Sequence, residues 1–522
     1  MTVPSARSMK KSSGRRHGMA LYIVILVVAL LTLAGYAFLS LMSTEFEATQ
    51  VRGTELQVQH VTQSGVSWME SILTLSGLER DKRGGLYDNP RQFCAVPVFG
   101  EQHGERNTAR FTIISPKIEN SVITGVRYGL TNESGKLHLA KILEWETQMQ
   151  GAGKKALLNL PGMTETMADS ILDWVDADTT PRINGAELPE YQQLGLPYGP
   201  RNAVPVSLEE LLMVRDVTRE NLFGGDENFN FVPDDMESGK QNRTHQLAWT
   251  HLLTVHSAER DASPEGFARI DLNQPDLKFL HKLLEERVNK KVADFVILLR
   301  QFGPETTASE KPAPSAKQPQ PVIDFETAAT YRLMTPLDVV GVSVGIPDFE
   351  TAIDSPIGTD QASLEGILLT FLDQATTSPT TTIIGRVNIN ESPREVLLGI
   401  PEMTSQMVQQ IINRRNNQRA TFRHPSWLLA EKIVDLPTLK MLWPEITCGG
   451  DVFRAQIIGF FDETGTFSRR ETVVDATVFP PREISPKDLT SYGIGFSNPV
   501  LFGENIAATP QNSLQSIMDA IR

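Results

Sequence analysis

The strongest hydrophobic pattern in the chain lies near its start. Residues 19–42 read MALYIVILVVALLTLAGYAFLSLM and contain no charged side chain. A helix of that length extends about 36 Å, which exceeds the hydrocarbon thickness of about 30 Å that a spanning helix must cross. The sequence therefore predicts a transmembrane helix over 19–42. A cleaved signal peptide is the alternative, but its apolar region is shorter and ends in small residues.

Apolar positions keep a helical spacing beyond this run, from Thr44 to about Leu78, which predicts that the helix continues onto a globular head. Residues 92–140 change to a strand pattern, with FCAVPVF, ARFTIIS and VITGVRYGL separated by turn residues. A second strand pattern occupies 453–479, where Asp462 to Gly465 predict a hairpin turn. We therefore expect one small sheet built from two distant portions of the chain.

About 300 residues between the two strand portions have mainly helical patterns and contain internal repeats. NLPGMTETMADSIL (159–172) and GIPEMTSQMVQQII (399–412) share five residues at equivalent positions. The similar segments KLHLA (136–140), RIDLN (269–273) and RVNIN (386–390) each precede a predicted helix pair. We interpret this region as a helical insertion with at least three related helix–turn–helix units, near 137–175, 270–303 and 387–415.

Charge and composition add boundaries to this picture. Residues 1–18 contain five basic side chains and no acidic one, so the net charge of −14 leaves −19 on the remainder. Such an acidic body repels phosphate backbones and argues against general nucleic-acid binding. The basic segment before the apolar run places the N-terminus in the cytoplasm and the bulk of the chain outside. Five prolines in 303–322 predict a flexible linker between two lobes, 141–302 and 323–448.

The sharpest chemical signal is the acidic segment DENFNFVPDDME. Positions 1, 3, 5, 7, 9 and 12 of an EF-hand-type calcium loop would be Asp226, Asn228, Asn230, Val232, Asp234 and Glu237. Phe231 stands where glycine normally permits the turn, so an ordinary acidic loop is an equal alternative. Another acidic group is interpreted as a solvated helix end, with a second oxygen cluster as the alternative: Asp173, Asp176 and Asp178.

Two motifs resemble functional sites without their usual context. LPGM (160–163) resembles a helix–hairpin–helix turn that binds DNA phosphates, but acidic residues follow it, so a packing module is favoured. The features that favour DNA are Arg414, Arg415 and Arg419. GVSVG (341–345) would make Ser343 a nucleophile, but Pro347 interrupts the helix that this motif needs. His251 and His256 are interpreted as structural.

The two cysteines flank the insertion. An oxidising compartment would allow Cys94 and Cys448 to form a disulfide that closes this long loop. Two free thiols are equally compatible with the sequence, because the distance between the cysteines is not encoded in their spacing.

Taken in order, these features resemble the K-type minor pseudopilin of the type II secretion system (general secretion pathway protein K). The similarity covers about residues 10–480, and the proline-rich linker and the long tail depart from it. It is carried by a basic leader ending in Gly18, by Ile23 where most pilin-like subunits have Glu, and by LNLPGMTETMADSILDWVDAD (158–178), VSLEELLMVRDVT (206–218) and RVNINESPREVL (386–397).

The resemblance implies an α+β fold in which a transmembrane helix leads into a pilin-like α/β head whose small sheet is interrupted by the helical insertion with helix-hairpin-helix-like repeats. The implied segments are a leader (1–18) cut between Gly18 and Met19, the membrane helix (19–42), a helix extension with the first strands (43–140) and the last strands (449–480). The sequence leaves open whether the tail, 481–522, is ordered.

The implied function is that of a non-enzymatic subunit at the tip of a periplasmic pseudopilus, anchored by one pass in the inner membrane. Its expected partners are the I- and J-type minor pseudopilins and the major pseudopilin, whose assembly it would prime for export of folded proteins. No nucleic acid is expected, and calcium is the one candidate cofactor. The alternatives are an envelope DNA-uptake receptor and a membrane-anchored hydrolase that uses Ser343.

Overall fold

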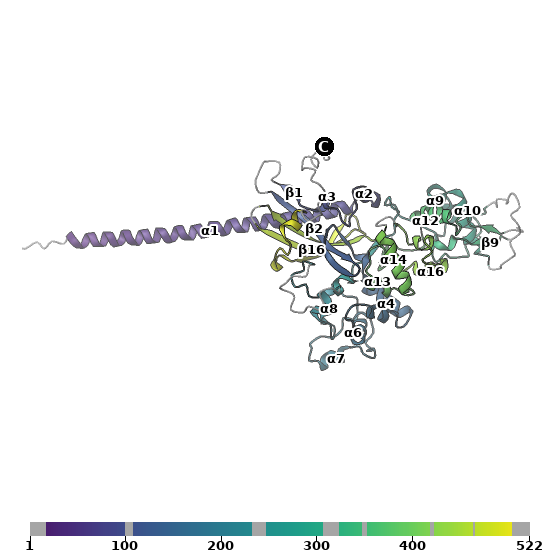
Figure 1. The fold of residues 1–522 in the computed structure, drawn as a ribbon, viewed down its shortest axis with the longest axis horizontal. Helices are drawn as coiled ribbons and strands as arrows, with labels where there is room; N and C mark the ends of the chain where they lie inside the picture. The colour runs from purple at the N-terminus through teal and green to yellow at the C-terminus, as the bar shows by residue number, and fades with distance from the viewer. Residues whose placement is uncertain are drawn as a thin grey trace, which may run out of the picture. The chain divides into compact units, whose positions relative to one another are not determined.

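The computed structural model describes residues 17–99, 108–231, 247–305, 323–346, 352–417, 422–462 and 465–503. The chain divides into two units, residues 1–60 and 61–522. The described part of the first unit is one continuous helix, the start of α1 (His17–Leu73; Figure 1), and all side chains of its apolar run 19–42 are exposed. Among the described residues, α1 is the helix that is long and apolar enough to cross a membrane, as predicted. Residues 1–16 of the expected leader lie outside the described ranges.

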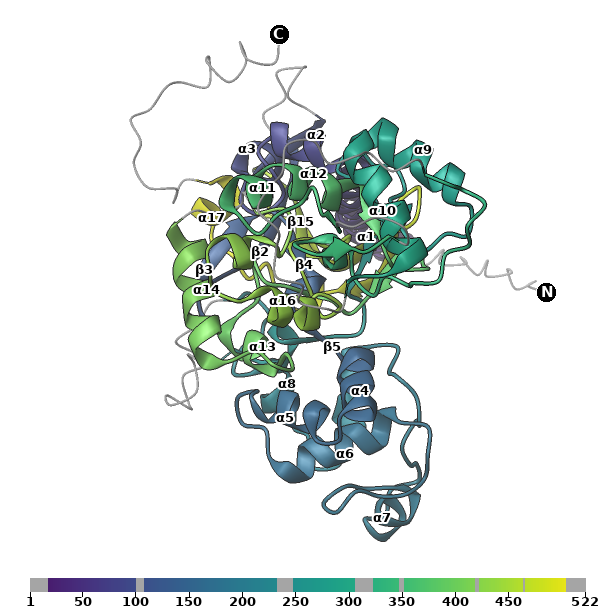
Figure 2. The same cartoon turned by 90° about the vertical axis from the view of Figure 1, so that its right-hand side faces the viewer.

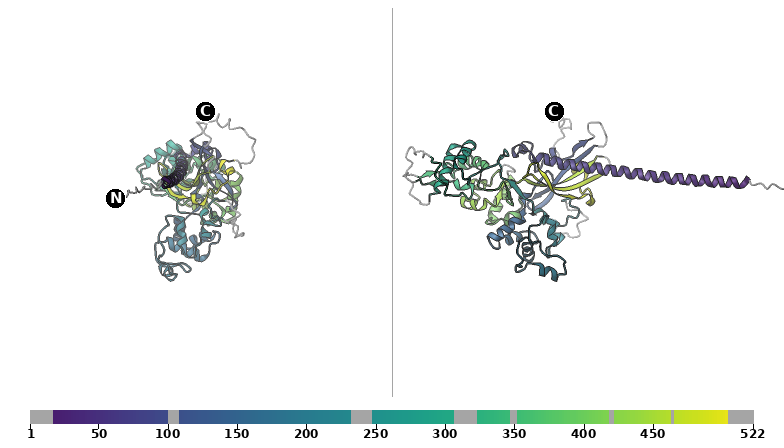
Figure 3. Two further views of the ribbon diagram at one scale, coloured as in Figure 1. Left: turned by 90° about the vertical axis from the view of Figure 1, so that its left-hand side faces the viewer. Right: turned by 180° about the vertical axis from the view of Figure 1, so that it is seen from behind.

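The second unit contains a seven-stranded antiparallel sheet with the strand order β1-β2-β15-β16-β17, in which β3 pairs with β2 and β4 with β15. The central pairing joins the two sides of the insertion, because Ile113 of β2 lies opposite Ile457 of β15. Figure 3 shows the yellow C-terminal strands beside the blue strands that precede the insertion. The bounds are β1 (Val96–Phe99), β2 (Ala109–Glu119), β3 (Val122–Tyr128), β4 (Thr131–Asn132), β15 (Val452–Phe461), β16 (Phe467–Asp475) and β17 (Arg482–Asp488).

The last turns of α1 pack against this sheet within the second unit. Val61, Val66 and Met69 are buried there. A Cβ atom added at Gly65 would lie 2.6 Å from Cγ2 of Ile457, so glycine allows the helix backbone to approach β15 closely. The short helices α2 (Gly77–Lys82) and α3 (Pro90–Phe93) follow.

The first part of the insertion is a compact group of helices (Figure 2). Its elements are α4 (Leu139–Gln148), α5 (Ala152–Leu158), α6 (Glu165–Val175), α7 (Leu188–Gln193), the 3-10 helix η3 (Leu208–Met213) and α8 (Arg219–Phe223). Ser207 precedes η3 but makes no side-chain cap among the described residues. Glu210 instead accepts a hydrogen bond from Nε1 of Trp174 at 3.0 Å, because it faces the buried side of α6.

The second lobe begins earlier than predicted. β7 (Ala258–Arg260) pairs with β12 (Thr382–Ile384), and β8 (Ile270–Asp271) pairs with β11 (Ala375–Thr376), so residues 253–302 pack with the segment after the linker. The expected boundary at 303–322 is therefore misplaced, since these pairings join distant positions and leave no trace in local composition. The other elements are η5 (Trp249–His251), α9 (Leu277–Arg287), α10 (Lys290–Phe302), η6 (Pro336–Val339), β9 (Ser343–Val344), β10 (Ile353–Asp354), α11 (Gln361–Glu365), α12 (Ile367–Gln374), α13 (Arg394–Gly399), α14 (Ser405–Asn417), α15 (Trp427–Ala430) and α16 (Leu436–Leu442).

The three predicted repeats share a local structure. Each begins with a two-residue strand that pairs in parallel with a short strand farther along the chain, and helices follow the first strand. The pairs are β5 (Leu137–His138) with β6 (Leu253–Thr254), β8 with β11, and β13 (Val387–Asn388) with β14 (Ile446–Thr447). The turn before α6 has Gly162 at φ +69°, and the equivalent turn before α14 has Glu402 at φ +62°.

The sheet extends into residues 481–522, the tail whose order the sequence left open. β17 lies at 482–488 and forms an edge of the sheet on β16, and α17 (Asn498–Phe502) follows the 3-10 helix η7 (Thr490–Tyr492). Pro486 weakens the strand signal in the sequence, but proline is compatible with an edge strand. The carbonyl of Leu501 accepts a hydrogen bond from the hydroxyl of Thr112 at 2.8 Å, which ties α17 to β2. Residues 504–522 lie outside the described ranges.

Candidate functional site

A buried ion pair recurs in all three repeats. The residue that precedes the first strand of each repeat is basic, and it pairs with an acid that is at most 9% exposed. The pairs are Lys136 with Glu133 (2.7 Å), Arg269 with Asp261 (3.2 Å) and Arg386 with Glu259 (2.7 Å). Each acid also accepts a hydrogen bond from a threonine of the second strand, namely Thr254, Thr376 and Thr447, respectively.

The same threonines also organise the backbone that follows them. Each Oγ1 accepts a hydrogen bond from the backbone N–H two residues later, at 3.0 to 3.3 Å. One side chain therefore connects the strand pair, the buried acid and the next turn. The sequence signal for the basic residue was visible in KLHLA, RIDLN and RVNIN, but its acid stands at a different separation in each repeat, 3, 8 and 127 residues away, and the threonines are distant in all three, so neither was recognised.

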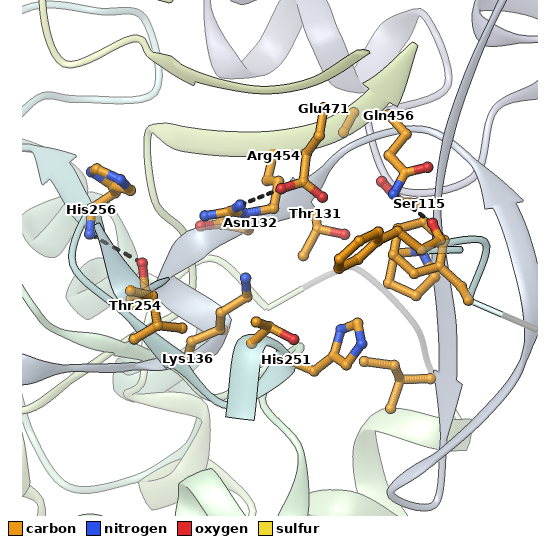
Figure 4. A pocket seen from close by; sticks show the side chains of 18 of the residues that line it. Ser115, Thr131, Asn132, Lys136, His251, Thr254, His256, Arg454, Gln456 and Glu471 are labelled. Atoms are coloured by element: carbon orange, nitrogen blue, oxygen red, sulfur yellow. Dashed lines mark hydrogen bonds and ion pairs between the residues drawn. The ribbon is translucent and has the colours of Figure 1, made fainter. Parts of the chain in front are cut away.

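A polar cavity of about 120 Å³ lies beside the first of these pairs, between the sheet and the insertion (Figure 4). Arg454 of β15 donates to Glu133 at 2.8 Å and to Glu471 of β16 at 2.8 Å. Burial alone would raise the pKa of Glu133, but Arg454 and Lys136 outweigh it and hold this pKa well below its usual range. The cavity is large enough for several water molecules. Glu133 connects the sheet with the insertion, because it accepts hydrogen bonds from Arg454 of β15 and from Thr254 of the insertion.

His251 and His256, interpreted from the sequence as structural, both line this cavity. Burial first, and then the charges of Lys136 and Arg454, lower the pKa of His251 to about 3. Burial likewise lowers the pKa of His256. Both imidazoles are therefore neutral at pH 7, as expected for structural histidines.

An acidic cluster lies at the end of α6 in the first lobe. One carboxylate oxygen from each of Asp176, Asp178 and Glu187 lies within 4.8 Å of the others. Asp176 and Glu187 are only 7% and 2% exposed. Even so, Oδ1 of Asp176 and Oε1 of Glu187 have no hydrogen-bond partner among the described residues. The expected solvated helix end is wrong for Asp173 and Asp176, which are buried, whereas Asp178 is exposed; the chain folds back over Asp173 through Arg182.

The charges of this cluster are only partly compensated. Arg182 pairs with both Asp173 and Asp176, yet burial still raises the pKa of each acid. The pKa of Glu187 is raised to about 7, first by burial and then by the neighbouring carboxylates. Unpartnered, crowded oxygens of this kind fit a hard divalent cation such as calcium. Glu187 has no sequence motif that could have revealed it.

The EF-hand-like segment is described only in its first half. Asp226 accepts hydrogen bonds from the backbone N–H groups of Asn230 (3.1 Å) and Phe231 (2.9 Å), and Asn228 caps the same turn at 2.9 Å. Phe231 has φ +64°, the conformation for which an EF-hand uses glycine. Val232, Asp234 and Glu237 lie outside the described residues, so their predicted role as ligands stays a prediction.

A guanidinium stands beside this loop. Arg469 donates to the carbonyl of Asn228 at 2.9 Å and also to that of Phe229. Asn230 donates its side-chain amide to the carbonyl of Gly495 at 3.0 Å. A cation at this position would be repelled by Arg469, so the described half of the loop fits calcium less well than the cluster on α6 does.

The remaining motifs occupy structural positions. Ser343 lies in the two-residue strand β9, where its hydroxyl donates to Asp354 of β10 at 2.6 Å, so it is not at the strand-to-helix elbow that a nucleophile of this class needs. The carbonyl of Pro161 in the LPGM turn accepts from Nε1 of Trp249 at 2.9 Å. Arg414 pairs with Glu431, and Arg415 donates to backbone carbonyls. Arg419 lies outside the described residues.

Both cysteines are free thiols in the structure, which is the second of the two alternatives that the sequence allowed. Sγ of Cys94 contacts the carbonyl of Leu501 at 3.6 Å, and burial raises the pKa of this thiol to about 11. Burial also raises the pKa of the Cys448 thiol.

Comparison with known proteins gives one match within the first lobe. Residues 143–222 match a family model described as type II secretion system (T2SS), protein K, first domain. These residues include α4–α8 and the acidic cluster. No curated protein sequence matches the chain significantly.

One solved structure with a detectable likeness is the GspK-GspI-GspJ complex from the type 2 secretion system of enterotoxigenic Escherichia coli. A chain of that complex is 10% identical, and the alignment covers 83% of this chain and 98% of that chain with a TM-score of 0.34. A TM-score this low supports no argument about fold or partners.

The family match relates residues 143–222 to type II secretion system protein K, the same family that the sequence as a whole resembles.

Proposed function

We propose that the protein is a minor pseudopilin that acts at the tip of a type II secretion pseudopilus. The observation that carries this proposal is the protein K match over residues 143–222, in a chain that also has a helix able to span a membrane. The role is one of assembly, without catalysis: the chain primes the growth of a pseudopilus that exports folded proteins.

The apolar helix supports a place at the tip. Cleavage between Gly18 and Met19 would make Ile23 the fifth mature residue. An acid at this position in lipid needs a positive partner from a neighbouring subunit, because an unpaired charge there costs several kcal/mol. A subunit with Ile23 has no such requirement and can stand first in the stack. The basic leader favours a cytoplasmic N-terminus and a periplasmic head, anchored in the inner membrane.

The proposed partners are the I- and J-type minor pseudopilins, together with the major pseudopilin. Their interaction is tested by expressing the tagged full chain with both minor subunits in membranes and identifying co-purified proteins after detergent extraction. The N-terminus of the purified chain is sequenced in the same experiment. We expect both subunits to co-purify and the mature chain to start at Met19. Failure of both subunits to co-purify would contradict the proposal, as would a mature start near residue 40.

We propose calcium binding separately from the role in pseudopilus assembly. We place the ion at Asp176, Asp178 and Glu187, since two of these acids carry buried oxygens without a partner. The melting temperature of the full chain in detergent should rise with calcium relative to chelator, and Glu187→Gln should remove most of this rise. Asp226→Asn is the matched control in the other candidate loop. An equal melting temperature with calcium and with chelator contradicts the proposal, and loss of the rise in Asp226→Asn alone would assign calcium to that loop.

A further inference from the structure

A groove of about 830 Å³ opens in the second unit. One wall is formed by residues 74–80, which follow α1 and include Arg80 of α2. The opposite walls are the connection from β7 to β8 (259–269) and segments 372–378 and 440–451 of the second lobe. This volume lies within the range of about 300–1,000 Å³ that is typical of ligand sites.

Part of the charge in the groove is already neutralised. The ion pairs of the second and third repeats line it, and each acid of these pairs is satisfied by one arginine and one threonine, as described above. Glu265, an exposed acid at the mouth, contacts only the amide of Gln374 at 3.4 Å. The basic side chains that these acids do not neutralise determine which ligand charge the groove can bind.

Two arginines share a single carboxylate at one end of the groove. Arg80 and Arg260 approach the same Oδ1 atom of Asp451 at 3.6 Å and 3.5 Å, which are long contacts for ion pairs. Burial lowers the pKa of Arg80; the charge of Asp451 opposes this effect, and the charge of Arg260 adds to it. One carboxylate cannot compensate two guanidinium groups, so this end of the groove has a local excess of positive charge.

A weakly paired guanidinium lies in the wall formed by the segment before α15. The Arg423 side chain is 54% exposed and is 4.0 Å from Asp373. Asp373 already accepts a hydrogen bond from His424 at 2.8 Å. Arg423 is therefore weakly held and available to an incoming anion.

Three hydrogen-bond donors of residues that line the groove have no acceptor among the described residues. They are Nε of Arg260, Nε of Arg386 and the hydroxyl of Ser263, and all three atoms are buried. Ser263 is only 5% exposed. Buried donors are normally paired, so three unpaired donors in the lining of one groove indicate a missing acceptor. The rim adds apolar contact through Met334 and Met441, whose exposed fractions are 75% and 56%, and methionine adapts readily to varied partners.

We propose that this groove binds an extended acidic peptide segment of a partner protein. Carboxylate side chains of that segment would pair with Arg80 and Arg260, and its backbone carbonyls would accept from Ser263 and Arg386. The exposed methionines would contact apolar side chains between the acidic ones. A small inorganic anion would satisfy the arginine pair, but it would leave most of the groove and its apolar rim unused.

The test uses the full chain in detergent micelles and a fluorescent hexaglutamate peptide, with binding measured by anisotropy. Arg260→Gln removes one charge of the arginine pair, and Ser263→Ala removes only an unpartnered hydroxyl, so the second variant is expected to fold normally. Lys282→Gln is the matched control, because it removes one positive charge on α9 from a side chain that is 70% exposed. Melting temperatures establish that each variant is folded.

Hexaglutamate should bind saturably, and uncharged hexaglutamine should not. Arg260→Gln should weaken the affinity about tenfold and Ser263→Ala about threefold, whereas Lys282→Gln should change it less than twofold. The proposal is overturned if hexaglutamate does not bind, if hexaglutamine binds equally well, or if the Lys282 and Arg260 variants lose the same affinity. Saturable binding of tripolyphosphate without binding of hexaglutamate would assign the groove to a small anion and also overturn it.

Discussion

Replacing Glu133 by glutamine tests whether this buried carboxylate holds the sheet and the insertion together. Glu133 is fully buried and accepts from Lys136 at 2.7 Å, from Arg454 at 2.8 Å and from Thr254. Breaking a buried ion pair from one side costs about 3–5 kcal/mol. Glutamine retains one acceptor oxygen, and Arg454 retains Glu471, so we expect a loss near the lower limit, about 3 kcal/mol.

The assay is urea unfolding of the full chain in detergent, followed by tryptophan fluorescence, since Trp249 is buried in the insertion. The control is Glu119→Gln, because the Glu119 side chain is 42% exposed and pairs with Lys117 at 3.2 Å; this change should cost less than about 0.5 kcal/mol. Because the folded pKa of Glu133 is depressed, its contribution is present above the unfolded pKa of about 4.3 and is lost as the pH falls below it. A loss below about 1 kcal/mol at pH 7 would refute the reasoning.

Three further predictions concern single side chains. Burial lowers the pKa of His138 to about 4, so the unfolding free energy should decrease as the pH falls from 6.5 toward 4, by about 2 kcal/mol at pH 5. In urea titrations at different pH values, His138→Asn should flatten this dependence. Glu402 has a positive φ where the first repeat has Gly162, so Glu402→Gly should raise the unfolding free energy by about 0.5–1 kcal/mol and Gly162→Glu should lower it. Because burial raises the pKa of Cys94 to about 11, iodoacetamide at pH 8 should modify it much more slowly in the folded chain than in urea.

The sequence was informative where a pattern is local. The apolar run 19–42, the strand pattern of 109–115 and the repeat pairs were all visible as short periodic or similar segments. The boundary of the second lobe was misplaced because proline content marks a connection but carries no information on strand pairing. β17 was missed because Pro486 breaks its pattern.

The candidate sites depend even more on contacts between residues that are distant in the sequence. Asp176 and Asp178 were recognised as an acidic group, but their burial depends on the fold of the following segment and on Arg182. Glu187 joins them only in three dimensions. The acids of the repeated ion pairs were likewise not recognisable, because no spacing rule connects Glu259 with Arg386.

The pairing of β2 with β15 has a consequence for the order in which the chain folds. When the chain emerges from N- to C-terminus, β2 must wait for more than 300 residues before its central neighbour appears. During this interval the apolar edge of β2 is open to other strands, whereas the helices of the insertion can form from near neighbours. The chain is therefore most exposed to aggregation while the sheet is incomplete. A chaperone that shields strand edges would act in this interval, before β15 is synthesised.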